Sequence, residues 1–153
     1  MAQDVTVRLL RQSDGDAVRA LDQLILGEDR STTWDAHVNR FLELTELETL
    51  PHPPIGSHIA EVDGRIVGFL LAEVQAGQYG LPRGVWIVAV GVDPGMRRMR
   101  IGARLVEALL AQCRERGIPD IFATLSPEDE RDASFLRSCG LQPSRVQVFG
   151  RSV

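Results

Sequence analysis

Residues 85–111 read VWIVAVGVDPGMRRMRIGARLVEALLA and carry the clearest pattern of secondary structure in the chain. Its first part, Val85–Val92, predicts a buried strand, because interior strands of a sheet are apolar on both faces. A proline-containing turn and a basic segment follow, and Gly102 opens a helix whose apolar residues recur at helical spacing. Backbone N–H groups at a helix start lack partners and carry partial positive charge. Strand, basic loop and helix start together indicate a binding site for a phosphorylated ligand.

The composition predicts one globular domain over residues 1–153. The chain has 44% hydrophobic and 25% charged residues, which is ordinary for a single core of this size. Its net charge of −4 at pH 7 argues against a general nucleic-acid-binding protein, because such proteins are usually basic. A local cluster of arginines in this acidic chain favours an anionic ligand. The clustered residues are Arg97, Arg98, Arg100 and Arg104.

Cysteine, histidine and hydropathy patterns restrict the setting further. Cys113 and Cys139 lack CxxC spacing, so we expect reduced thiols and a cytoplasmic protein. The histidines show no spacing typical of metal ligands, so no metal site is expected. No stretch approaches the ~20 apolar residues of a membrane span, and the N-terminus lacks the features of a secretory signal. We therefore expect neither a membrane nor a nucleic-acid partner.

The spacing of apolar residues, prolines and glycines predicts the element order β-α-α-β-β-β-α-β-α-β. Ser13 is a candidate N-cap for the first helix, and Asp63-Gly64 is typical of a tight hairpin turn. The predicted strands are residues 6–10, 57–62, 65–74, 85–92, 121–125 and 146–149. The predicted helices are residues 13–27, 28–50, 102–117 and 127–138.

The phosphate motifs of nucleotide-binding folds are missing, whereas another family's motifs are present. There is no G-x-x-x-x-G-K-[ST] and no G-x-G-x-x-G after a strand. The segment V-x-V-D-P-x-x-R-R-x-R-I-G-A resembles the acetyl-CoA site of the GCN5-related N-acetyltransferase (GNAT) family. Its signature, [QR]-x-x-G-x-[GA], falls on Arg97–Gly102, and a second family segment, F-[YL]-x-x-x-G-[FL], falls on Phe135–Leu141. The resemblance implies an α/β fold with a mixed, mostly antiparallel sheet and helices on both faces.

The resemblance also implies a reaction and a set of cofactor contacts. Acetyl-CoA would donate an acetyl group directly to a primary amine of a small molecule or a protein in a ternary complex, and a homodimer is typical of many members. The backbone of Val90, Gly91 and Val92 would pair with the pantetheine arm and the acetyl carbonyl. The helix start would hold the pyrophosphate. The implied residues there are Arg97, Arg98, Met99, Arg100, Ile101, Gly102 and Ala103.

Three positions depart from the family pattern. Arg100 replaces the first glycine of the signature, Leu136 replaces a tyrosine that commonly protonates the departing thiolate, and Trp86 lies where some members carry a glutamate. Neither leucine nor tryptophan can do proton chemistry of this kind. Glu73 is a candidate substitute base and Tyr79 a candidate substitute acid. The alternatives are that Glu73 is an outward-facing strand residue and that Tyr79 is a surface tyrosine.

The departures leave a second function open, a catalytically weak acyl-CoA-binding or regulatory module. The first two predicted helices are acidic, which suits a cationic amine acceptor and suits an ordinary solvated helix face equally. The acidic residues are Glu28, Asp29, Asp35, Glu43, Glu46 and Glu48.

Overall fold

The computed structural model of the chain describes residues 3–27, 32–46 and 56–153. Its strands form one sheet in the order β1-β2-β3-β4-β5, and all neighbours are antiparallel except β4 and β5. The strands are β1 (Val5–Leu9), β2 (His58–Val62), β3 (Arg65–Gln75), β4 (Gly84–Val92) and β5 (Ile121–Ala123). The helices are η1 (Gln12–Asp14), α1 (Gly15–Leu26), α2 (Thr32–Glu46), η3 (Pro94–Met99), α3 (Ile101–Glu115) and α4 (Glu130–Ser138). The mixed, mostly antiparallel sheet is confirmed.

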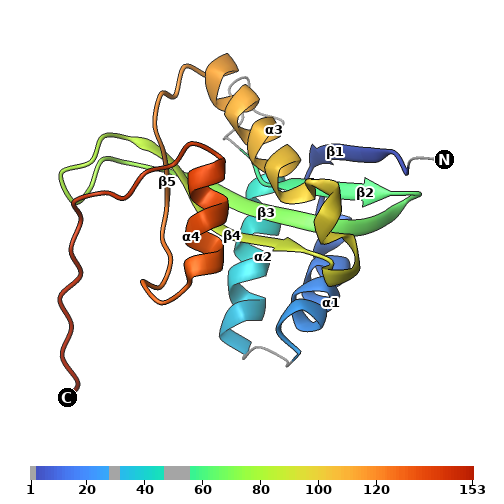
Figure 1. Cartoon of the computed structure of the whole chain (residues 1–153), viewed down its shortest axis with the longest axis horizontal. Helices are drawn as coiled ribbons and strands as arrows, with labels where there is room; N and C mark the ends of the chain where they lie inside the picture. Colours follow the sequence, from blue (N-terminus) through green and yellow to red (C-terminus); the bar gives the residue numbers. More distant parts are fainter. Residues whose placement is uncertain (1–2, 28–31, 47–55) are drawn as a thin grey trace.

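Helices cover both faces of this sheet (Figure 1). On one face, α1 and α2 pack over a core that contains Phe41 and Phe69, which we call the α1/α2 core. On the other face, α3 packs over a core that contains Leu70 and Leu105, which we call the α3 core. Phe135 of α4 packs against the margin of the α3 core. The predicted two-sided arrangement is therefore present, and β4 runs between the two cores.

The local sequence explains the elements next to β4. Asp63 and Gly64 both have positive φ, 50° and 74°, as a type I′ turn requires, and they join β2 to β3. Helix α3 keeps its apolar residues on one stripe, as its spacing predicts. The buried residues of that stripe are Ile101, Leu105, Val106, Leu109 and Cys113.

The start of α1 differs from the prediction by its capping residue. Ser13 lies within η1, and Asp14 directly precedes the helix, which begins at Gly15. The Asp14 carboxylate accepts two hydrogen bonds from the Arg8 guanidinium, at 2.8 and 2.9 Å, and one from the Arg11 N–H at 2.7 Å. The Asp14 carboxylate therefore holds Arg8 and the 3₁₀ turn together, and no side chain caps the start of α1.

The predicted last strand, Val146–Phe149, is wrong. Residues 141–153 form no regular secondary structure, and Val148 and Phe149 are 94% and 91% exposed. A strand needs a neighbour to complete its backbone hydrogen bonds, and no strand in the described ranges pairs with this segment. The predicted helix over residues 127–138 is present but begins later, at Glu130, where the Asp129 carboxylate accepts a hydrogen bond from a first-turn N–H.

Candidate functional site

The two edges of β4 differ. On one side β4 pairs with β3 from Gly84 to Val92, with one interruption. On the other side it pairs with β5 only over Val85–Ile87. In the described part of the chain, residues 88–92 therefore face no strand on the β5 side. Because backbone N–H and C=O groups need partners, this open edge can pair with an extended ligand.

A bulge marks the point where β5 pairing ends. The β3–β4 register shifts between Leu71 and Ala72, which leaves Val88 of β4 without a partner residue on β3. Val88 and Ala89 consequently both pack toward the α1/α2 core, although neighbours in a regular strand alternate between faces. Bulges bend a strand and increase its twist. This one lies directly after Ile87, the last β4 residue that pairs with β5.

The chain turns sharply between β4 and α3. The 3₁₀ helix η3 replaces the predicted loop, and Arg100 then adopts the left-handed conformation, with φ 55° and ψ 28°. Arg100 thus keeps the backbone shape that glycine adopts easily. No side chain caps α3, so the N–H groups of Ile101, Gly102 and Ala103 have no partner within the helix. This helix start can bind an anion.

Exposed arginine side chains surround the start of α3. Arg97, Arg100 and Arg104 are exposed, and none of them forms an ion pair with another residue in the described ranges. The Arg98 side chain lies outside the described residues. Unpaired guanidinium groups can contact phosphate oxygens through two parallel hydrogen bonds. The arrangement therefore combines unpaired backbone donors with mobile positive charge.

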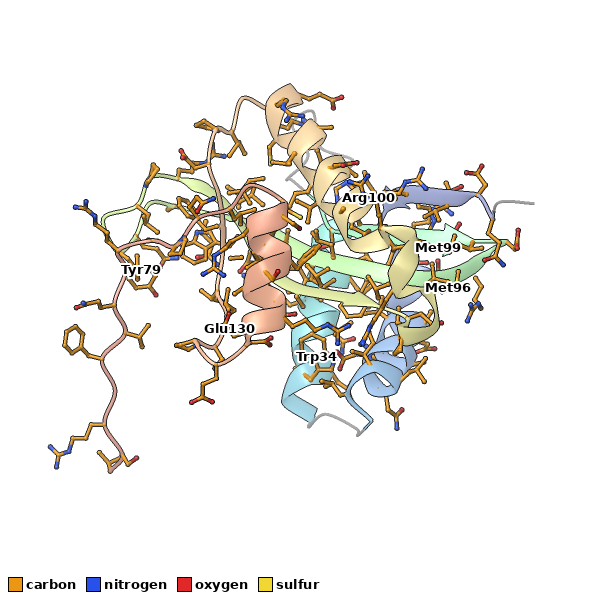
Figure 2. The ribbon with its side chains drawn as sticks, in the orientation of Figure 1. Trp34, Tyr79, Met96, Met99, Arg100 and Glu130 are labelled. Carbon is orange, nitrogen blue, oxygen red and sulfur yellow. The ribbon has the colours of Figure 1, made fainter. Side chains whose placement is uncertain are left out.

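Two apolar residues of the same segment have a different environment. Met99 and Ile101 pack against the α3 core, and Ile101 is only 1% exposed. Because their side chains pack inside the protein, these residues can contact a ligand only through their backbone. Figure 2 shows Met99 and Arg100 together at the end of the sheet opposite Tyr79.

Gly102 brings the two sequence motifs into contact. A Cβ atom on Gly102 would lie 3.0 and 3.2 Å from Cε2 and Cζ of Phe135, which belongs to the second motif on α4. Distances this short are tighter than ordinary packing, so a larger residue would displace the Phe135 ring. Gly102 therefore has a packing role against α4, which the sequence analysis did not identify, in addition to the expected cofactor contact.

Gly91 has a packing role that the sequence analysis missed. A Cβ atom on Gly91 would lie 2.5 and 2.7 Å from Cε1 and Cζ of Phe69 and 2.8 Å from Cδ1 of Ile25. Phe69 is directly opposite Gly91 on β3 and is 1% exposed. The ring therefore occupies the space that a side chain at position 91 would need. Only the backbone of Gly91 remains for the predicted cofactor contact.

The other end of β4 carries side chains rather than open backbone. Trp86 lies opposite Glu73 of β3, and its ring contacts Phe122 of β5, with a centroid separation of 5.2 Å. Tyr79, in the loop between β3 and β4, meets Trp86 edge to face at 6.3 Å. The fold thus brings both candidate catalytic residues, Glu73 and Tyr79, to Trp86. The three rings of Tyr79, Trp86 and Phe122 are called the aromatic cluster below.

Glu73 is not an outward-facing strand residue. It is only 9% exposed, and its carboxylate forms an ion pair with the Arg40 guanidinium of α2. One carboxylate oxygen also accepts a hydrogen bond of 3.0 Å from the Gln75 amide. Tyr79, in contrast, is 68% exposed and has a left-handed backbone, with φ 57°. The carboxylate is therefore fixed in position, whereas the phenol is accessible to solvent.

Comparison with known proteins agrees with this geometry. The family model "Acetyltransferase (GNAT) family" matches residues 18–141. The chain belongs to the GNAT family. Its open β4 edge and its uncapped α3 start lie within the matched range, whereas β1 precedes it. Helix α4 with the second motif also lies there.

Two curated relatives of this GNAT chain are acetyltransferases by name. It is 29% identical over 99 residues to L-2,4-diaminobutyric acid acetyltransferase of Nocardia farcinica, which covers 62% of this chain and 50% of that protein. It is 28% identical over 99 residues to mycothiol acetyltransferase of Thermomonospora curvata, over 65% of this chain and 32% of that protein. This chain therefore spans half or less of these relatives.

A solved structure shares the fold over nearly the whole length. Aminoglycoside N-acetyltransferase AAC(6')-Iy, in complex with CoA, superposes with a TM-score of 0.78. The match covers 99% of this chain and 97% of that one, at 18% identity. At this identity the likeness supports the fold alone. It places the described sheet and helices among GNAT structures.

The remaining predicted features of this GNAT chain have mixed outcomes. Leu136 is half-buried on α4 and has no proton to donate.

In the acidic region, Asp35 and Glu43 are exposed, and Asp35 pairs with Arg19 at 3.3 Å. Glu28, Asp29 and Glu48, with the side chain of Glu46, lie outside the described residues. Within the described ranges, no group of three or more His, Cys, Asp or Glu could hold a metal ion, and no helix could cross a membrane.

Proposed function

We propose that the chain is an acetyl-CoA-dependent N-acetyltransferase that transfers the acetyl group directly to a primary amine. The observation that carries the proposal is the continuity of two unpaired backbone surfaces. The uncapped start of α3 lies beside the end of β4, where a Cβ atom on Gly102 would be 3.8 Å from Cγ2 of Val92, and the open β4 edge runs from there back to the bulge at Val88. Strand geometry puts about 13 Å between Val92 and Val88. A phosphate group carrying a long extended arm fits this layout, whereas a compact phosphorylated ligand would leave the edge unused.

The contacts of acetyl-CoA follow from these surfaces. Its phosphates would accept hydrogen bonds from the N–H groups of Ile101, Gly102 and Ala103, with Arg97 and Arg100 in reach as counter-charges. Its pantetheine amides would pair with the open edge at Val90, Gly91 and Val92, as a neighbouring strand does. The thioester would then lie near the bulge, where a backbone N–H can stabilise the oxyanion that forms during attack.

The reaction itself needs two proton transfers. An alkyl amine with a pKa near 10.4 is only about one part in 2,500 neutral at pH 7, so the acceptor must lose a proton before it attacks. The amine nitrogen then bonds to the thioester carbon, the C–S bond breaks, and the nitrogen loses its second proton as the thiolate takes one up, which leaves the amide and free CoA. We propose that the Glu73 carboxylate, acting through water, removes the proton from the ammonium group. We propose that the Tyr79 phenol protonates the thiolate. Their common position around Trp86 supports this pairing.

The acceptor side favours a cationic amine. The aromatic cluster presents ring faces and edges beside the Glu73 carboxylate, and ammonium groups are attracted to such faces. We therefore propose a polyamino compound or amino acid with a free amino group as the acceptor. L-2,4-Diaminobutyric acid and an aminoglycoside, the compounds in the names of two similar proteins, are suitable first compounds.

A catalytically weak acyl-CoA-binding module is the second candidate. Three observations favour it: Arg40 and Gln75 already engage the Glu73 carboxylate, Tyr79 is largely exposed, and Leu136 cannot act as an acid. In this case the α3 end of β4 would bind acyl-CoA, whereas the residues at the Trp86 end would have only a structural role.

Calorimetry with acetyl-CoA, combined with a free-thiol release assay over an amine panel, separates the two candidates. Binding together with amine-dependent thiol release would support the enzyme. Binding without release for every amine would support the module. No binding of acetyl-CoA would overturn both, since each depends on the α3 start and the open β4 edge.

A further inference from the structure

The ion pair between Arg40 of α2 and Glu73 of β3 is buried on one side and open to solvent on the other. The Glu73 side chain is 11% exposed, whereas the Arg40 side chain is 56% exposed. Both Nη atoms of the guanidinium donate to the carboxylate, Nη1 to Oε1 at 3.3 Å and Nη2 to Oε2. A molecule that approaches from solvent therefore meets the guanidinium before it reaches the carboxylate.

Helix α2 does not need this ion pair to stay on the sheet. Val38 and Phe41 of α2 are 1% and 2% exposed, and both pack in the α1/α2 core. Replacing a buried ion pair with apolar residues is often neutral or stabilising, so packing alone gives little reason for charges here. Because apolar residues anchor the helix, the long and half-exposed Arg40 side chain can change its partner without a movement of the backbone.

The ion pair lies at one end of the aromatic cluster. Glu73 is opposite Trp86, and Trp86 is opposite Phe122, so these three residues form a row across β3, β4 and β5. Arg40 covers the β3 end of the row from α2, which lies on the face of the sheet opposite α3 (Figure 1). The Gln75 amide also donates to Glu73 Oε1, at 3.0 Å, so the carboxylate keeps one donor if Arg40 leaves. The row thus places a carboxylate, a guanidinium and aromatic rings side by side.

An ammonium group that binds Glu73 competes with Arg40. If it displaces the guanidinium, Arg40 loses its carboxylate partner and is left beside a second positive charge, which is unfavourable. A carboxylate on the same molecule removes this penalty, because it can accept the two parallel hydrogen bonds that Arg40 otherwise donates to Glu73. One ion pair is then exchanged for two, with the charges alternating in sign. A diamine offers no group for this exchange.

We propose that Arg40 is a specificity-determining residue that binds the carboxylate of an amino acid acceptor, while Glu73 binds the ammonium group of the same molecule. This role rests on the proposed function, in which Glu73 removes a proton from the reacting nitrogen. It narrows the acceptor to an amino acid. A simple diamine, or an aminoglycoside without an anionic group, is then a poor ligand because it leaves Arg40 without a partner.

Matched compounds that differ only by a carboxylate test the proposal on the full chain. The pairs are L-2,4-diaminobutyric acid with 1,3-diaminopropane, L-lysine with 1,5-diaminopentane, and L-phenylalanine with 2-phenylethylamine. In at least one pair the amino acid should have a kcat/KM about 100-fold above that of its partner, measured by thiol release from acetyl-CoA, because its partner leaves a charged group unpaired. Calorimetry in the presence of CoA, which cannot donate an acetyl group, should show the same preference in Kd.

Variants at position 40 separate carboxylate binding from a structural role. Arg40→Gln should raise KM for the amino acid and reduce the preference at least about ten-fold, whereas kcat should change less than about three-fold because the Glu73 carboxylate remains. Arg40→Lys keeps the charge without the two-pronged geometry, so it should restore part of the preference. Arg114→Gln is the matched control, since it makes the same charge change at an exposed position of α3, and it should leave the preference unchanged.

The outcomes distinguish this role from the proposed reaction. No preference in any pair, a preference that Arg40→Gln leaves intact, or an equal loss in Arg114→Gln would overturn the role of Arg40. Thiol release with amino acids and their partners alike would overturn it as well, but would leave the N-acetyltransferase reaction standing. A preference in calorimetry without thiol release from any compound would overturn the reaction and leave the carboxylate site standing.

Discussion

The two ends of β4 are built on different principles. At the α3 end, unpaired backbone groups form the proposed cofactor site, and the side chains of Met99 and Ile101 pack into the α3 core. At the Trp86 end the backbone is paired on both sides, and side chains from β3, β5, α2 and a loop form the proposed catalytic site. Backbone sites depend on a few residues close in sequence and therefore leave a motif. Side-chain sites join distant segments and leave none.

Removing the charge of Glu73 at the Trp86 end should have the largest effect on catalysis. Glu73→Gln should lower kcat by about 100- to 1,000-fold, roughly 2.7–4 kcal/mol, because a general base contributes on this scale. The acetyl-CoA affinity measured by calorimetry should stay within about two-fold of wild type. Arg40→Gln is the matched control, since it breaks the same ion pair but keeps the carboxylate. If both variants lower stability equally and leave kcat unchanged, Glu73 only anchors α2.

Acid should lower the free energy of unfolding, because His58 of β2 is buried in the sheet beneath α3. His58 shares a row across the sheet with Leu70 and Val90, and its Nδ1 is buried without a hydrogen-bond partner in the described structure. Burial lowers the pKa of His58 from 6.5 to about 4, against a smaller opposing effect of a Gly56 backbone hydrogen bond. The unfolded chain therefore binds more protons between these values, and this contribution to stability is lost as pH falls from 6.5 to about 4. The expected loss is roughly 3 kcal/mol.

Urea unfolding at a series of pH values measures this loss. His58→Gln has no titrating group, so its free energy of unfolding should fall less over the same interval. If the free energy of unfolding changes equally with pH in both proteins, His58 is solvated and is not buried in the sheet as described.

Gly91 lies at the proposed cofactor end of β4, but it packs against the α1/α2 core. Gly91→Ala should lower the free energy of unfolding by about 1–3 kcal/mol, since the new Cβ would meet the Phe69 ring at 2.5 Å. Adding Phe69→Leu, which clears that space, should recover part of the loss beyond the cost of Phe69→Leu alone. Chemical denaturation of the four proteins gives the coupling energy. Strict additivity would show that position 91 and Phe69 do not compete for space.

Arg100 gives the smallest expected effect and separates strain from ligand contact. Arg100→Gly should raise the free energy of unfolding by about 1 kcal/mol, because glycine adopts φ 55° without the steric penalty of a side chain. The same variant should bind acetyl-CoA several-fold more weakly, because it removes an unpaired guanidinium from the helix start. Arg104→Gln controls for general loss of positive charge. Tighter binding of acetyl-CoA by Arg100→Gly would mean that the arginine obstructs the site.

The sequence predicted the α3 end well because its determinants are local. The apolar strand, the arginines and the signature lie within 85–104, and the second motif adds only α4. The packing role of Gly91 was missed, because Phe69 and Ile25 come from other elements. The Arg40–Glu73 ion pair joins residues 33 positions apart, and no pattern in one sequence signals such a contact. The Val146–Phe149 strand had the right composition, but pairing depends on a neighbour that the chain's own described sheet does not supply.

The central claim is that one continuous backbone surface, from the α3 start to the β4 bulge, binds acetyl-CoA. Titration of ¹⁵N-labelled protein with acetyl-CoA, followed by amide chemical shifts, tests it most directly. We predict that the largest shifts fall on Ile101, Gly102 and Ala103 and on residues 88–92 of β4, with small changes at Trp86. Saturable binding with its largest shifts away from both segments, or no shifts at all, would contradict the account.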